Sequence, residues 1–490
     1  MTTNKDNSPS LILAFIPIIA LIILLGLNVW LFGDDTLSGS NQLTLLFSAA
    51  IAAIIGYIIK VPWKKMLDGA IASISSAMGA LIILLLIGSL AGTWMLSGIV
   101  PAMIYYGLDI LSPSIFLFAC CIVCAIVSLA TGSSWSTIAT IGIAMLGIGT
   151  ALGIPEGLIG GAIISGAYFG DKMSPLSDTT NLAPAMAGTD LISHIKYMMW
   201  TTVPSITISL IAFLIIGFVC FGSEAIIDDV GTMQEAIIGK YNITPWLFLV
   251  PVVVIFMIVK KVPAIPALLF GTLAGGIFAV IFQPNLILEQ GINSIELSSK
   301  SFNYIKSSYI AVMNSMTVDV DVDTGNSAVN KLVSTSGMSG MLNTIWLIIC
   351  AMSFGGVMEA TGLLKRITES LMIFVKSRKS LVLTTSSTCL FFNVTASDQY
   401  LAIVVPGRMF ADTYKKYNLD PKNLSRTLED SATVTSVLVP WNTCGATQAG
   451  VLGVATLTYL PYCFFNLISP LMTILFAYAS IKIAKIKNEN

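Results

Sequence analysis

The chain has 490 residues, of which 55% are hydrophobic and only 10% are charged. Lys and Arg number 25 and Asp and Glu number 26, so the formal net charge is −1, whereas about 25% of the residues of a soluble domain are charged. So few charges cannot cover a water-soluble fold of this size, which argues against a soluble enzyme, a nucleic-acid binder, a disordered chain and a secreted disulfide scaffold. We expect an all-α polytopic membrane protein with about ten to twelve spans of roughly 20 residues each.

Apolar runs predict the spans in chain order. The first run, 11–32, follows a polar N-terminus and is too long for a signal-peptide core, so we interpret it as a retained span. Unbroken runs predict further spans at 43–60, 70–96, 198–222, 243–259, 264–284, 341–360 and 460–484. Polar clusters interrupt four other apolar stretches near their middles, at 115–152, 157–189, 380–412 and 423–457.

Clusters of basic residues indicate which ends of the spans are cytoplasmic. They follow the run 43–60 at Lys64 and Lys65, and the run 243–259 at Lys260 and Lys261. Acidic segments fall on the opposite side, and they include Asp34, Asp35, Glu224 and the loop 285–340. We therefore predict a multi-pass protein of the inner (cell) membrane with both termini in the cytoplasm.

This distribution of charge requires that 115–152 and 380–412 enter and leave the membrane by the same face, as re-entrant helical hairpins. Segments 157–189 and 423–457 are then spans with an unwound middle. Irregular backbone inside a membrane is tolerated only where it is buried or lines a cavity, so the four breaks are candidate functional positions.

The two halves of the chain resemble each other at a constant separation of 264 residues. Ser89, Gly92 and Gly98 match Ser353, Gly356 and Gly362, and Thr131 and Ser133 match Thr395 and Ser397. Segment 97–113 has no Lys or Arg, whereas its counterpart 361–379 is rich in both, which places the two on opposite faces. Inverted repeats are typical of secondary transporters with a site near the midplane. The predicted domains are 1–66 (N-terminal spans), 67–222 (repeat 1), 223–340 (connecting spans and an acidic external loop) and 341–490 (repeat 2).

Oxygen-bearing side chains gather at the four breaks. A hard cation such as sodium prefers oxygen ligands, and carboxylates inside a membrane mark ion paths or proton relays. For a single Ser or Thr, the alternative is a hydrogen bond to the carbonyl one turn back in the helix. The predicted sodium ligands are Thr131, Ser133, Ser134, Asp171, Asp178, Thr179, Asn181, Asn393, Thr395, Ser397, Asp398, Glu429, Asp430, Thr433 and Asn442.

Motifs for catalysis and cofactor binding are not found in the sequence. There is no phosphate loop, dinucleotide fingerprint or convincing catalytic triad, so we predict neither an enzyme nor a bound cofactor. Cys121 and Cys124 have C-x-x-C spacing, but no second Cys pair or His cluster supports a metal site. We expect the eight cysteines to be packing residues.

The broken segments carry a family resemblance. The stretch 170–184, GDKMSPLSDTTNLAP, resembles the signature of the NhaC-type sodium/proton antiporter family, and so do 131–137, 393–398 and 428–442. The resemblance implies the ion-transporter superfamily, with inverted repeats, hairpins, elevator-like movement and usually a homodimer. Some members exchange sodium for protons, while similar proteins exchange malate for lactate or carry amino acids.

We predict a secondary active transporter that exchanges sodium for protons. One of Asp171, Asp178, Asp398, Glu429 and Asp430 would release a proton when sodium binds, because protonation removes the charge that holds the ion. The alternative is a sodium- or proton-coupled transporter or exchanger of a small organic acid or amino acid. A passive channel or a non-transporting sensor is a third reading, which the paired broken segments disfavour.

Three charged or titratable side chains near the breaks have expected roles of their own. We expect Lys172 to neutralise Asp171 or Asp178, and Arg408 to neutralise Asp398 or Asp412. We expect His194 to be a solvated residue of a cytoplasmic loop.

Overall fold

The computed structural model describes residues 9–32, 39–222, 227–293 and 304–486, which are helical apart from turns, loops and one isolated bridge between Val320 and Thr335. Asp34, Asp35 and Glu224 lie outside the described residues. In the first half the helices are α1 (Leu11–Phe32), α2 (Ser40–Ile58), α3 (Trp63–Leu96), α4 (Ile99–Ile110), α5 (Pro113–Thr131), α6 (Ser134–Thr137), the π-helix η2 (Ile138–Gly142), α7 (Ile143–Ala151), α8 (Glu156–Met173), α9 (Asp178–Ala187) and α10 (Leu191–Phe221).

The second half continues in the same way. Its elements are α11 (Ile227–Lys240), η4 (Pro245–Phe248), α12 (Leu249–Val259), α13 (Ala264–Phe282), α14 (Pro284–Asn293), α15 (Tyr304–Thr317), α16 (Ser327–Leu332), η5 (Ser339–Met341), α17 (Leu342–Ala360), α18 (Leu363–Leu371), η6 (Met372–Phe374), α19 (Arg378–Thr395), α20 (Gln399–Lys416), α21 (Pro421–Leu428), the π-helix η7 (Glu429–Thr433), η8 (Ser436–Leu438), α22 (Thr443–Leu452), α23 (Thr456–Tyr459), η9 (Leu460–Tyr462) and α24 (Phe464–Tyr478).

Eight helices among the described residues are long and apolar enough to cross a membrane, and two bent helix pairs raise the number to ten. This confirms the prediction of an all-helical multi-span membrane protein. One pair bends by 89° between Val230–Lys240 and Pro245–Val259, and the other by 57° between Thr456–Tyr462 and Phe464–Tyr478. The apolar runs 243–259 and 460–484 do not reveal these bends, because hydropathy records composition and not the direction of the chain. The runs 115–131 and 134–151 each pass the length test on their own, so the re-entrant hairpins stay a prediction.

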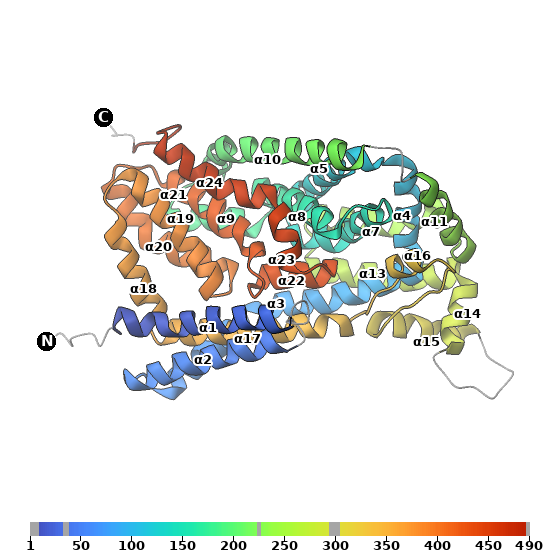
Figure 1. Cartoon of the computed structure of the whole chain (residues 1–490), viewed down its shortest axis with the longest axis horizontal. Helices are drawn as coiled ribbons and strands as arrows, with labels where there is room; N and C mark the ends of the chain where they lie inside the picture. The colour runs from blue at the N-terminus through green and yellow to red at the C-terminus, as the bar shows by residue number, and fades with distance from the viewer. Residues whose placement is uncertain (1–8, 33–38, 223–226, 294–303, 487–490) are drawn as a thin grey trace.

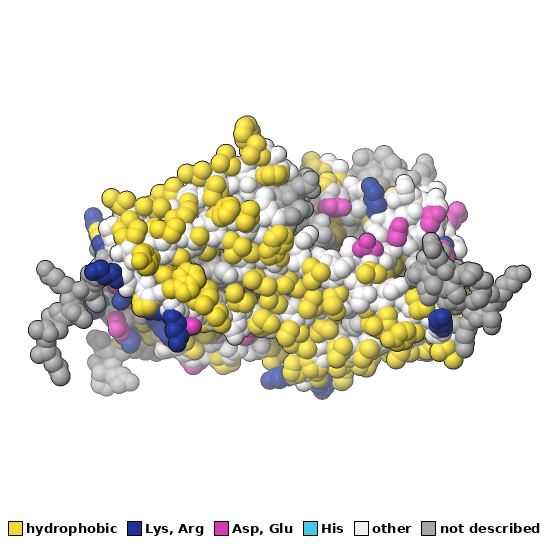
Figure 2. Space-filling model, turned by 90° about the horizontal axis from the view of Figure 1, so that it is seen from below, with side chains coloured by type: hydrophobic (Ala, Val, Ile, Leu, Met, Phe, Trp, Pro, Cys, Tyr) yellow, Lys and Arg dark blue, Asp and Glu magenta, His cyan; other side chains and the backbone are white. Residues whose placement is uncertain are grey.

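The longest helices lie roughly along the long axis of the molecule (Figure 1). A layer that contains α1, α2, α3 and α17 lies on one side, and the broken helices lie above it. The two ends of the described chain lie at the same end of the long axis. Figure 2 shows hydrophobic side chains over most of one face, with the few charges mainly towards its ends and rim, as expected of a surface that faces lipid.

Helices α3 and α17 pack against each other over small residues. A Cβ added to Gly69 would lie 2.8 Å from the carbonyl oxygen of Gly356. Only glycine allows so close a backbone approach, which is how helices associate in a membrane without a hydrophobic driving force. The pair forms a base on which the broken helices rest.

Element boundaries recur between the two halves. Helices α3 and α17 end at Leu96 and Ala360, and the next helices begin three residues later, after Gly98 and Gly362. Both glycines have left-handed φ values, +81° and +76°. Helices α5 and α19 end at residues 131 and 395, and α9 and α22 begin at residues 178 and 443. Helices α4 and α18, which correspond in this alignment, lie at opposite ends of the molecule (Figure 1).

Candidate functional site

The four polar clusters coincide with four breaks in the helices. The breaks lie between α5 and α6, between α8 and α9, between α19 and α20, and between η8 and α22. Gly132 and Ser397 turn the chain at the first and third breaks with φ values of +70° and +59°. For Ser397 this left-handed conformation is unfavourable, so the surrounding contacts must hold it there.

The breaks surround a cavity of about 380 Å³ that lies against α3. Three carboxylates line it, from Asp171, Asp178 and Asp398, and none of the described residues around it is basic. The other lining residues are Ser76, Ala77, Gly79, Ala80, Ile83, Gly132, Ser133, Trp135, Ser136, Leu176, Ala264, Gln399, Tyr400, Thr443 and Cys444. Both halves therefore contribute to one acidic cavity.

Asp171 lies in the last turn of α8 and is only 6% exposed. Its Oδ2 accepts a hydrogen bond from the Ser134 hydroxyl (2.7 Å), which the first break places at the start of α6. Its Oδ1 is buried and has no hydrogen-bond partner among the described residues. A buried carboxylate oxygen with no partner is unfavourable unless a ligand or a proton satisfies it.

Asp178 and Tyr400 join the two halves at the mouth of the cavity. The Tyr400 hydroxyl, on the second turn-and-helix segment, donates to Asp178 Oδ2 at the start of α9. The other oxygen of Asp178 accepts from the backbone N–H of Thr179 (3.0 Å). Tyr400 is 44% exposed, so this contact lies at a solvent-accessible edge.

Asp398 caps the helix that follows the third break. Its Oδ1 accepts from the backbone N–H of Leu401 (2.8 Å) at the start of α20, and the residue is 6% exposed. Ser133 does the same at the first break, where its hydroxyl accepts from the N–H of Ser136 (3.2 Å). Each hairpin tip thus supplies a side-chain oxygen to a helix N-terminus that borders the cavity.

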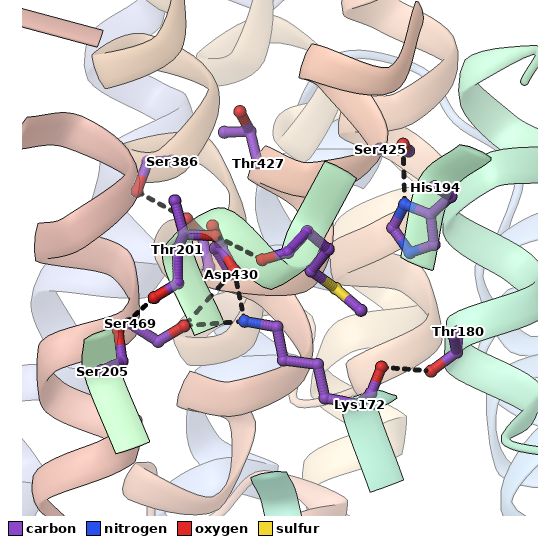
Figure 3. Close-up of polar contacts among 12 residues, drawn as sticks. Lys172, Thr180, His194, Thr201, Ser205, Ser386, Ser425, Thr427, Asp430 and Ser469 are labelled. Carbon is purple, nitrogen blue, oxygen red and sulfur yellow. Dashed lines mark hydrogen bonds and ion pairs between the residues drawn. The ribbon is translucent and has the colours of Figure 1, made fainter. Parts of the chain in front are cut away.

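A second group of charges is buried among α8, η7 and α24 (Figure 3). The Lys172 ammonium forms an ion pair with Asp430 and donates to the Ser469 hydroxyl (2.9 Å), and both charged side chains are fully buried. Glu429, the neighbour of Asp430, is also fully buried, and neither of its carboxylate oxygens has a partner among the described residues. This Lys172 group lies outside the lining of the acidic cavity.

The expected partners of three side chains are wrong. Lys172 pairs with Asp430 and not with Asp171, because consecutive helical residues point about 100° apart. His194 is buried in α10, where its Nδ1 lies 2.8 Å from the Ser425 hydroxyl, since the helix begins earlier than the apolar run suggested. Asp412 contacts Lys415 (3.7 Å), while Arg408 is exposed and Asp398 is buried.

The remaining predicted ligands lie within the breaks, and most of them make hydrogen bonds there. In the described structure no three Asp, Glu, His or Cys side chains form a metal-binding group. Thr433 and Ser397 have buried hydroxyls without a partner among the described residues. The others bond locally: Asn393 to Ala432 O (2.8 Å), Asn442 to Asn393 O (3.1 Å), Asn181 to Ser177 O (2.6 Å), Thr395 to Phe391 O (2.7 Å), Thr179 to Ser177 Oγ (3.1 Å) and Thr131 to Thr137 Oγ1 (3.3 Å).

Two residues of the site were missed in the sequence. Tyr400 directly follows the polar cluster of the third break, so its position next to Asp398 was a usable signal. Ser469 lies inside the apolar helix α24 and nothing in its local sequence distinguishes it from a packing residue. Its role depends on the approach of α8 and η7.

Helical breaks that surround a buried acidic cavity in a multi-span protein define a secondary transporter. A profile of the Na⁺/H⁺ antiporter family matches residues 166–481. The chain is 38% identical over 444 residues to the Na⁺/H⁺ antiporter NhaC of Alkalihalophilus pseudofirmus, covering 91% of each chain. It therefore belongs to the Na⁺/H⁺ antiporter (NhaC) family, as its motifs predicted, and is a membrane transporter and not an enzyme.

Other relatives in the family carry different names. The chain is 35% identical to the malate-2H⁺/Na⁺-lactate antiporter of Bacillus subtilis, over 91% of each chain. It is 34% identical to the arginine/ornithine antiporter ArcD of Halobacterium salinarum, over 98% of this chain and 94% of the relative. The family as a whole thus defines antiport but not one substrate.

Proposed function

We propose that this antiporter exchanges sodium ions for protons at the acidic cavity. The observation that carries the proposal is Asp171, a buried carboxylate that lines the cavity and has one oxygen without a partner among the described residues. Asp178 and Asp398 line the same cavity, and Ser133 and Ser134 lie at the adjacent break. Oxygen ligands of this kind suit a hard cation.

Competition for Asp171 accounts for exchange. A protonated carboxyl group has no charge to hold sodium, and a bound sodium ion disfavours the proton. The two ligands therefore exclude each other at one group. Asp430 is less suited to this role, because Lys172 already neutralises it. Glu429 is a second candidate for the proton, since it is buried without a partner among the described residues.

The proposal includes inverted repeats at 67–222 and 341–490, with the breaks between α5 and α6 and between α19 and α20 as re-entrant hairpins. The matching element boundaries and the opposite positions of α4 and α18 support it. Elevator-like movement would carry the cavity across the membrane relative to the base formed by α3 and α17. We also propose both termini in the cytoplasm and a homodimer, which tag accessibility in intact cells and cross-linking in membranes would test.

Proton flux in proteoliposomes tests the exchange directly. Sodium added outside vesicles with an acidic interior should release internal protons when the wild-type protein is present. Asp171→Asn should abolish this release, and Asp412→Asn, at an 86% exposed side chain, should retain it. If sodium moves no protons at any pH in the wild type, sodium/proton exchange is the wrong function.

The size of the cavity favours a second candidate function. A volume of about 380 Å³ exceeds the space that one sodium ion requires and falls within the range of small-molecule pockets. A coupled exchanger of a small organic acid or amino acid would use this extra space. A thermal-shift screen of metabolites with and without sodium separates the two, because an organic substrate coupled to sodium would stabilise the protein only in its presence.

A further inference from the structure

The lining of the acidic cavity contains more than sodium ligands. A water molecule occupies roughly 30 Å³ of the liquid, so a cavity of about 380 Å³ has room for several non-hydrogen atoms beside an ion. Ala77, Ala80 and Ile83 of α3 form an apolar wall, opposite the polar breaks in the lining. Such a wall has no use in holding a bare cation, but it can contact methylene groups.

The charge of the lining selects the sign of a ligand. Asp171, Asp178 and Asp398 contribute three carboxylates, and the described lining contains no Lys, Arg or His. The nearest basic residue along the chain, Lys172, is bound to Asp430 and Ser469 away from the cavity. An organic anion would therefore meet like charges without compensation, whereas a cation would be attracted.

Two aromatic side chains complete the lining. Trp135 and Tyr400 border the cavity, one from each half of the chain. Aromatic faces next to carboxylates attract ammonium groups through cation–π interactions. A primary ammonium group also has three N–H donors, and the buried Oδ1 of Asp171 is an acceptor that lacks a donor among the described residues.

We infer that the cavity binds small primary alkylammonium ions in competition with sodium. The ammonium group lies against Asp171, and the alkyl chain lies along the α3 wall, near Trp135. This assignment rests on the proposed function, because it uses the same cavity and the same carboxylate. It narrows the organic substrates of this chain to cations and disfavours monocarboxylates, which would have no countercharge among the described lining residues.

Binding to the full-length protein, purified in detergent, tests the inference. The probes are n-propylammonium chloride and potassium lactate, each against potassium chloride at the same concentration, with and without sodium. Propylammonium should raise the unfolding temperature and increase the apparent Kd for sodium, and lactate should do neither. If sodium stabilises the protein and propylammonium has no effect, the inference is overturned and sodium binding stands. If sodium has no effect either, the proposed function fails with it.

Two variants locate the binding site. Asp171→Asn should remove the effect of both cations, and if propylammonium still binds this variant as in the wild type, the assignment to this cavity is wrong. Trp135→Leu keeps the carboxylate, so it should lower propylammonium affinity about two- to five-fold relative to sodium affinity. An unchanged ratio of the two affinities would overturn the placement of the alkylammonium ion beside Trp135. This ratio remains measurable if Asp171→Asn does not fold.

Discussion

The two broken spans have corresponding boundaries but differ in how their breaks are held. The break before α22 is bonded to the second hairpin by Trp441 Nε1 to Val394 O (2.7 Å), Asn442 Nδ2 to Asn393 O (3.1 Å) and Thr443 N to Ser397 O (2.9 Å). The break before α9 borders the acidic cavity instead, and its Asn181 bonds to local backbone at Ser177. The second break is thus sealed against its hairpin, while the first is open to a ligand.

The same contrast appears in two cavities. A second cavity of about 460 Å³ lies on the other side of the second break and is lined by Gly340, Asn343, Thr344 and Leu347. These positions are each 264 residues after Ser76, Gly79, Ala80 and Ile83, which line the acidic cavity. The internal repeat therefore produces two related cavities, but the second has one carboxylate, from Glu156, in its described lining. The difference indicates that one side of the site is open and the other closed.

The largest expected effect comes from separating the two halves at their buried ion pair. Lys172→Met would leave Asp430 charged and fully buried, which costs about 3–5 kcal/mol. We expect a large fall in the unfolding temperature and in the yield of folded protein. The double variant Lys172→Met, Asp430→Leu should recover much of the loss, because it removes both charges. If the single variant unfolds at the wild-type temperature, the ion pair does not hold the halves together.

A smaller effect is expected when the sealed break is loosened. Trp441→Phe removes the indole N–H bond to Val394, worth about 1 kcal/mol, and retains an aromatic ring. We expect the second cavity to open more often, by roughly fivefold. Thr344→Cys, which lines that cavity, reports the opening by its rate of labelling with a polar maleimide.

The labelling requires a background without Cys220, which is the one exposed cysteine among those described. Trp246→Phe, at a 69% exposed tryptophan far from the break in sequence, is the matched control. Equal labelling rates in Trp441→Phe and Trp246→Phe would show that this hydrogen bond does not seal the break.

At the open break the expected effect is again modest and has the opposite consequence. Tyr400→Phe removes the donor to Asp178 Oδ2 and leaves this oxygen available to sodium. We expect the apparent Kd for sodium to fall by up to about fivefold, because a neutral hydrogen bond is worth about 1 kcal/mol. Tyr478→Phe, at a 46% exposed tyrosine, should leave the Kd unchanged. A weaker affinity in Tyr400→Phe would mean that the hydroxyl itself takes part in binding.

The sequence predicted where the chain breaks better than how the side chains meet. Polar clusters in apolar runs, with Gly132 and Pro175 at two of them, identified the positions of all four interruptions, because lipid leaves unpaired backbone no other partner. The partners of Lys172 and Tyr400 were not predictable, since each lies more than 200 residues away along the chain. Local pattern contains no information about which faces of distant helices come together.

The smallest expected effect concerns the ends of the two broken spans. Asp190 accepts the backbone N–H of Ser193 (2.9 Å) and caps α10, whereas Ala455, 265 residues later, begins α23 without a side-chain cap. Hydrogen bonds from Ser193 lower the pKa of Asp190 below its usual value. Its stabilisation is therefore complete above the unfolded-state pKa and is lost as the pH falls through the folded-state pKa. Asp190→Ala should lower the unfolding temperature by only about 1 °C near neutral pH, and this difference should vanish in acid. A difference that stays constant as the pH falls would show that the charge of Asp190 does not stabilise the helix.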